Sequence, residues 1–125
     1  MEAIVATVIA VIAVLGLAYS FGQGRAMIGR YEIARVALAA AQDEMETLSV
    51  TPPNDPALAI GSHTRTFVVG GQSLGMIQWN IGKFDDPANG LGGTGFDLKQ
   101  VVVTVSWTAG FDPGSVSLTR FFPSR

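Results

Sequence analysis

Residues 1–19, MEAIVATVIAVIAVLGLAY, consist of one acid followed by an apolar run, and this stretch decides the fold. Glu2 is its only charge, and Thr7 is the only polar side chain between Glu2 and Tyr19. As a helix the run would be about 25 Å long at roughly 1.5 Å per residue, near the lower limit for crossing a bilayer. No proline occurs before Pro52, so the helix is predicted to continue well beyond the run.

The apolar run has three interpretations. A cleavable secretory signal would begin with basic residues, whereas this chain begins with an acidic one. A signal anchor is the second, and Arg25 and Arg30 behind the run would then place the C-terminal part in the cytoplasm. In the third, a basic leader preceded Met1 and was removed, which would place the C-terminal part outside the membrane.

Composition excludes several classes of function. The chain has 125 residues, which is enough for one small domain plus an extension. A net charge of −2 and a pI near 5.1 argue against a nucleic-acid binder, which would show a basic face. The absence of cysteine removes disulfides, thiol catalysis and thiolate metal sites together.

The segment 25–50 is predicted to be an amphipathic helix that lies across a sheet. Its apolar positions recur at alternating spacings of four and three, with the charged residues off this stripe. The stripe comprises Met27, Tyr31, Ala34, Leu38, Ala41, Met45 and Leu48, and the residues placed off it are Arg30, Glu32, Arg35, Asp43, Glu44 and Glu46.

Glycines interrupt the helical pattern between the two segments. Each glycine weakens a helix by about 1 kcal/mol relative to alanine. We therefore predict a kink or a short unwound stretch near Gly16 or across Gly22 and Gly24, which would give a polymer elasticity. An intact but frayed helix is the alternative.

The remainder of the chain has a β pattern. Prolines at 52, 53 and 56 end the helix and open a loop. Four β-rich runs follow, at 65–69, 76–81, 100–107 and 115–121, and the alternation of Val101, Val103, Val105 and Trp107 predicts one buried face. We expect an α+β fold: a long N-terminal helix packed on a four-stranded antiparallel sheet.

Neither a cofactor nor a catalytic site is expected. The loop between the two predicted hairpins offers weak calcium candidates, Asp85, Asp86, Asn89 and Asp97, but their spacing matches no EF-hand. His63, the only histidine, is placed in a loop without a nucleophile pattern, so we predict no enzyme. Trp79 and Trp107 are expected in the core or an interface.

The sequence resembles a known family at three places. Residues 2–11, EAIVATVIAV, are similar to the mature N-terminus of type IV pilins and of type II secretion pseudopilins. Residues 34–48 resemble the second half of the helix of that family, especially in minor pilins and minor pseudopilins, and 101–107 fit the same branches. In the family the glutamate usually lies four residues after the processed N-terminus, whereas Glu2 lies one residue after Met1.

The resemblance implies a helical filament of identical subunits on a bacterial cell surface. The precursor would lie in the inner membrane and meet a prepilin peptidase and the pilus assembly machinery, and the processed first residue would be methylated. A carboxylate in hydrocarbon costs several kcal/mol unless a cation meets it. We therefore expect Glu2 to pair with the α-amino group of a neighbour's Met1; a solvated cap in the headgroup layer is the alternative.

The expected organisation has two parts. Residues 1–24 form the hydrophobic helix, which anchors the subunit in the membrane and later forms the filament core. Residues 25–125 form a pilin head with a helix at 25–50, a loop at 51–63 and a sheet at 64–125. The alternatives are a minor pilin or pseudopilin, or a monomeric membrane-anchored β domain.

Overall fold

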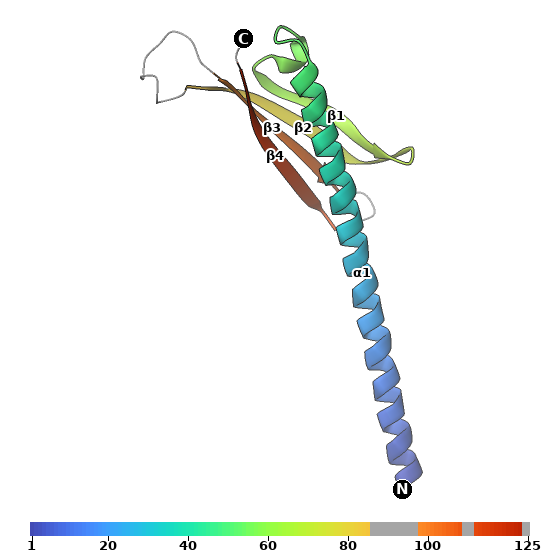
Figure 1. Ribbon diagram of the computed structural model, residues 1–125. Helices are drawn as coiled ribbons and strands as arrows, with labels where there is room; N and C mark the ends of the chain where they lie inside the picture. The colour runs from blue at the N-terminus through green and yellow to red at the C-terminus, as the bar shows by residue number, and fades with distance from the viewer. Residues whose placement is uncertain (86–97, 109–111, 124–125) are drawn as a thin grey trace. The chain divides into compact units, whose positions relative to one another are not determined.

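The computed structural model describes residues 1–85, 98–108 and 112–123. The chain divides into two compact units, Met1–Ile33 and Ala34–Arg125, and each is described by itself. The helix α1 spans Glu2–Val50 and contributes to both units (Figure 1). Helix and sheet together confirm an α+β fold with a long N-terminal helix.

Unit 1 is helical throughout, and its polar side chains bond within the helix. The hydroxyl of Thr7 donates to the carbonyl oxygen of Ala3 at 2.7 Å. The amide of Gln23 donates to the hydroxyl of Tyr19 at 3.2 Å. Such local bonds suit a helix without water around it, because its polar groups then need no outside partner.

The prediction of an unwound stretch is wrong for this structure, because α1 is unbroken through Gly16, Gly22 and Gly24. A cost of about 1 kcal/mol per glycine is small against the cooperativity of a long helix, in which each added residue gains a hydrogen bond. A Cβ atom added at any of these three glycines would meet nothing within 4 Å. The described residues therefore do not pack against them.

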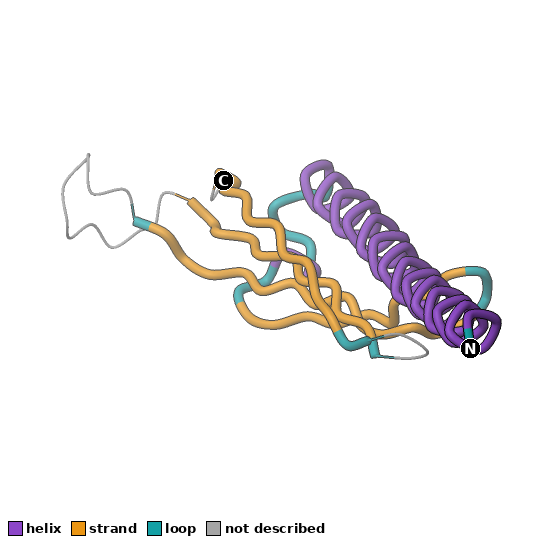
Figure 2. Tube along the Cα trace, turned by 90° about the horizontal axis from the view of Figure 1, so that it is seen from below, coloured by secondary structure: helices purple, strands orange, loops and turns teal. Residues whose placement is uncertain are grey.

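Unit 2 holds the predicted four-stranded antiparallel sheet. Its strands are β1 (Gly61–Val69), β2 (Gln72–Phe84), β3 (Leu98–Trp107) and β4 (Gly114–Pro123), in the spatial order β1-β2-β3-β4. Every neighbouring pair is antiparallel. The part of α1 that belongs to unit 2 lies over one face of this sheet (Figure 2). The sheet begins at residue 61 rather than 64, and the loop before it contains the 3₁₀ helix η1 (Pro56–Leu58).

The β1–β2 hairpin is tighter than the six-residue connection expected from the sequence. Gly70 and Gly71 both have positive φ, 58° and 81°, the conformation of a two-residue primed turn. The pairing register shifts between Phe67 and Val68, which face Gly75 and Ser73 respectively. Because this bulge absorbs one residue of β2, the strand continues through the segment that was expected to be loop.

The core lies between the helix and the sheet. Val101, Val103 and Val105 are fully buried and Trp107 is 6% exposed, as the alternation predicts. On the opposite side of the core, unit 2 buries Ala37, Ala41, Glu44, Met45 and Leu48 of α1.

The helical stripe was predicted correctly only in its second half. Ala41, Met45 and Leu48 are buried, but Leu38 is 39% exposed. In unit 1, Met27 and Tyr31 are exposed by 56% and 71%. A strict seven-residue repeat drifts about 20° per heptad around a straight helix. When the C-terminal end of the stripe is buried, its N-terminal positions are therefore rotated away from the buried face.

Candidate assembly surface

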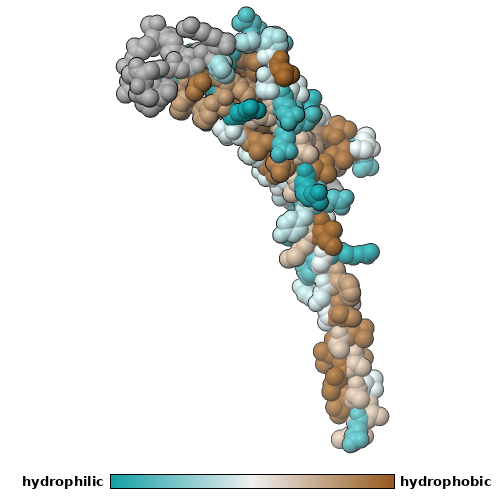
Figure 3. All heavy atoms as spheres, in the orientation of Figure 1, coloured by the Kyte–Doolittle hydropathy of each residue, from teal (hydrophilic) through white to brown (hydrophobic). Residues whose placement is uncertain are grey.

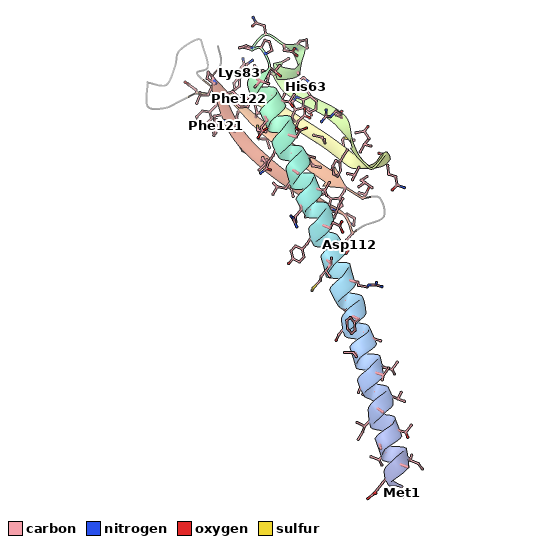
Figure 4. The ribbon with its side chains drawn as sticks, turned by 45° about the vertical axis from the view of Figure 1, so that its right-hand side comes forward. Met1, His63, Lys83, Asp112, Phe121 and Phe122 are labelled. Atoms are coloured by element: carbon pink, nitrogen blue, oxygen red, sulfur yellow. The ribbon has the colours of Figure 1, made fainter. Side chains whose placement is uncertain are left out.

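The apolar run of unit 1 is exposed on all sides. Every large apolar side chain from Ile4 to Leu17 keeps between 52% and 66% of its surface accessible. Figure 3 shows this end of the chain as a nearly continuous apolar surface, and Figure 4 shows its side chains around the helix. Soluble monomers rarely expose a contiguous apolar surface of this kind, so it requires lipid or protein around it.

Length and composition fit a membrane span. Within the part of the chain that the structure describes, α1 is the one helix long and apolar enough to cross a bilayer, and none of its most apolar stretch is buried. Signal sequences near an N-terminus share this length and apolar composition.

Met1 and Glu2 lie at the free end of this surface. Met1 is 97% exposed, and its carbonyl oxygen accepts a hydrogen bond from the amide of Val5 at 3.2 Å. Glu2 lies in the first helical turn, where the helix dipole favours a negative charge. Among the described residues no cation forms an ion pair with Glu2, so burial of this end would require a cation from another molecule.

A buried ion pair in unit 2 escaped the sequence analysis. Glu44 was placed off the apolar stripe, but it is 5% exposed and belongs to the buried face of α1. Its Oε2 lies 2.5 Å from Nη2 of Arg65 on β1, whose side chain remains 56% exposed. The signal was present in the sequence, because Glu44 follows Ala37 and Ala41 at spacings of seven and three.

His63 belongs to a structural cluster rather than to a loop. It lies in β1 directly opposite Trp79, and the two rings stack with centroids 5.4 Å apart. Trp79 is half-buried and donates its indole N–H to the carbonyl oxygen of Ala57 at 2.9 Å. The Nε2 atom of His63 lies 2.9 Å from the carbonyl oxygen of Ala59. These contacts hold η1 and its loop against the first two strands.

The calcium candidates fall almost entirely outside the described residues. Asp85 lies exposed just after β2, whereas Asp86, Asn89 and Asp97 belong to the part that the structure does not describe. Elsewhere, in residues 1–85, 98–108 and 112–123, no group of three or more His, Cys, Asp or Glu side chains could hold a metal ion.

A small hollow lies beside the C-terminal end of α1. It has a volume of about 200 Å³ and is lined by Leu48, Pro53, Lys99 and Phe122, among others. The ammonium group of Lys99 donates to the carbonyl oxygens of Pro53 and Leu58, at 3.2 and 3.1 Å. This amine therefore stabilises the loop after the helix.

Comparison with known proteins adds no relative: no family model, no curated protein and no solved structure matches this chain.

Proposed function

We propose that this chain is the structural subunit of an extracellular filament of the type IV pilus kind, polymerising through its N-terminal helix. The observation that carries the proposal is the apolar run exposed on all sides, in a helix whose C-terminal part packs on a small sheet. In the membrane, lipid would cover this run. In the filament, the equivalent helices of neighbouring subunits would cover it.

Burial of apolar surface would drive this assembly. Roughly 25 cal/mol is gained for each Å² of apolar surface removed from water, and the run exposes large side chains along its whole length. A bundle of such helices excludes water as lipid does. The free energy of polymerisation then comes mainly from unit 1, while the sheets form the shell.

Glu2 and Met1 would set the register of the bundle. Without a cation, a carboxylate in a dry helix bundle is unfavourable by several kcal/mol. The α-amino group of Met1 is the cation nearest to Glu2 in the sequence. In a bundle of parallel helices, a neighbouring subunit would supply it. Pairing the two would fix the axial stagger between adjacent helices.

The same exposed run also fits a monomer that stays in the bacterial inner membrane and displays its sheet outside. Minor pilins and type II secretion pseudopilins share the proposed assembly chemistry and differ in abundance and context. Only the monomeric alternative predicts that the run faces lipid permanently.

Cysteine cross-linking distinguishes a filament from a monomer, because the chain has no cysteine of its own. Subunits that carry a single Ile12→Cys substitution should be linked into dimers, in material sheared from cells, by a bifunctional maleimide long enough to bridge axially staggered helices, and electron microscopy should show filaments. Thr64→Cys, exposed on β1, is the matched control and keeps the same thiol content. Protein found only in membranes, with no dimer at residue 12, would contradict the filament.

A further inference from the structure

The exposed side of α1 in unit 2 carries opposite charges at its two ends. This outer helix face lies opposite the buried face and comprises Arg35, Leu38, Ala39, Gln42, Asp43 and Glu46, all of them exposed. At 100° per residue, Asp43 and Glu46 lie within about 80° of Arg35 around the helix.

Within one molecule, Arg35 cannot reach Asp43 or Glu46. Asp43 and Glu46 follow Arg35 by eight and eleven residues, about 12 and 16 Å along a helix. An ion pair needs its atoms within about 4 Å, and no ion pair is formed by these three side chains among the described residues. The acids also lie toward the helix C-terminus, where the dipole disfavours negative charge and the last turn has no basic residue.

We propose that Arg35 of one copy binds Asp43 and Glu46 of a second, parallel copy displaced by about 12–16 Å along the helix axis. The inference rests on the proposed function, because the helices of the proposed filament are parallel and axially staggered. Arg35 lies near one end of the outer helix face, and Asp43 and Glu46 lie near the other. Each copy therefore offers a guanidinium to one neighbour and two carboxylates to another.

The surface between the charges suits close approach. Leu38 is 39% exposed, and Ala39 beside it is small, so two such faces can meet without bulky side chains between them. Contact there would remove water from around the ion pairs, which strengthens them relative to fully solvated pairs. An interfacial charge pair of this kind contributes register and specificity more than bulk affinity.

Charge reversal and restoration test the pairing in the full-length chain. Arg35→Glu alone, and Asp43→Lys with Glu46→Lys, should each lower the yield of sheared filaments at least tenfold. All three substitutions together should restore it to within about twofold, because every interface regains opposite charges. Arg120→Glu, an exposed reversal on β4 outside this face, is the control and should leave the yield unchanged. Thermal unfolding in detergent checks that each variant is folded.

The outcomes distinguish a failure of the pairing from a failure of the proposed function. The pairing would be overturned if the wild type forms filaments and the charge reversals on one side leave the yield unchanged. It would also be overturned if the combined variant shows no recovery. In both cases the proposed function would stand. An absence of wild-type filaments would overturn both. Ala39→Cys separates the orientations: an antiparallel pair would bring the two copies of residue 39 together, whereas the stagger keeps them beyond disulfide reach. A residue 39 disulfide would therefore overturn the parallel arrangement.

Discussion

At the scale of single residues, one glycine is fixed by the close approach of two strands. A Cβ atom at Gly75 would lie 1.9 Å from the carbonyl oxygen of Ser106 on β3, a distance no side chain tolerates. Gly75→Ala should lower the free energy of unfolding by about 2 kcal/mol or more, because the backbone must shift to admit the methyl group. Chemical denaturation of the full chain in detergent measures this.

Gly82 provides the matched control on the same strand. A Cβ atom there meets nothing within 4 Å, so Gly82→Ala should change the free energy of unfolding by less than about 0.5 kcal/mol. If the two substitutions changed the free energy of unfolding equally, the close approach of β3 would not be the reason that position 75 requires glycine.

The Glu44–Arg65 pair predicts an asymmetric response. Arg65→Ala should destabilise unit 2 by about 2 kcal/mol, because it leaves the carboxylate of Glu44 buried without its partner. Glu44→Gln should cost less, since a neutral amide needs no cation. The same denaturation experiment compares them, and Arg120→Ala, an exposed arginine on β4, serves as the control. A larger loss for Glu44→Gln than for Arg65→Ala would contradict this account of the pair.

The sequence predicted which residues are buried in the core better than it predicted the contacts between segments that are distant in the sequence. Alternating valines reveal a buried strand face without reference to the rest of the fold. The partner of Glu44 lies on a strand that begins well after the helix, so only the folded register brings the two together. The same holds for Gly75, whose constraint comes from Ser106 on another strand.

At the scale of elements, the continuity of α1 changes what its glycines are expected to do. Gly22→Ala with Gly24→Ala should stabilise the helix by up to about 1 kcal/mol per site, because both sites are already helical and have open space around them. Circular dichroism at 222 nm during heating in detergent should show a later loss of helix. An earlier loss would mean that the glycines serve a contact with another helix.

The elements themselves were predicted well and their ends less well. Proline and glycine positions located the helix end and the hairpins, since these residues act locally. The strands extend beyond the predicted runs because neighbouring strands recruit residues of low β propensity, such as Gln72 and Gly75 in β2. The stripe on α1 failed at Met27 and Tyr31, because a periodic pattern does not reveal where the packed face ends.

At the scale of the whole molecule, the proposed filament gives Glu2 the role of setting the axial register between subunits. It does not need Glu2 for the stability of the subunit in the membrane. Glu2→Gln keeps the size of the side chain and removes its charge. The variant should enter the membrane as well as the wild type, because the apolar run is unchanged. It should be incorporated into filaments several-fold less efficiently, since the neighbour's α-amino group would lose its partner in a dry bundle.

Membrane fractionation and sheared-filament yield, measured on the same cells, separate the two steps. Glu32→Gln is the matched control: it makes the same chemical change on an exposed residue of the same unit, beyond the apolar run. Normal filament yield from Glu2→Gln would assign this carboxylate to the headgroup layer. Reduced membrane content in Glu2→Gln alone would assign it to insertion. Loss of filaments with normal membrane content is the outcome that pairing requires, because only assembly brings the carboxylate next to a second chain.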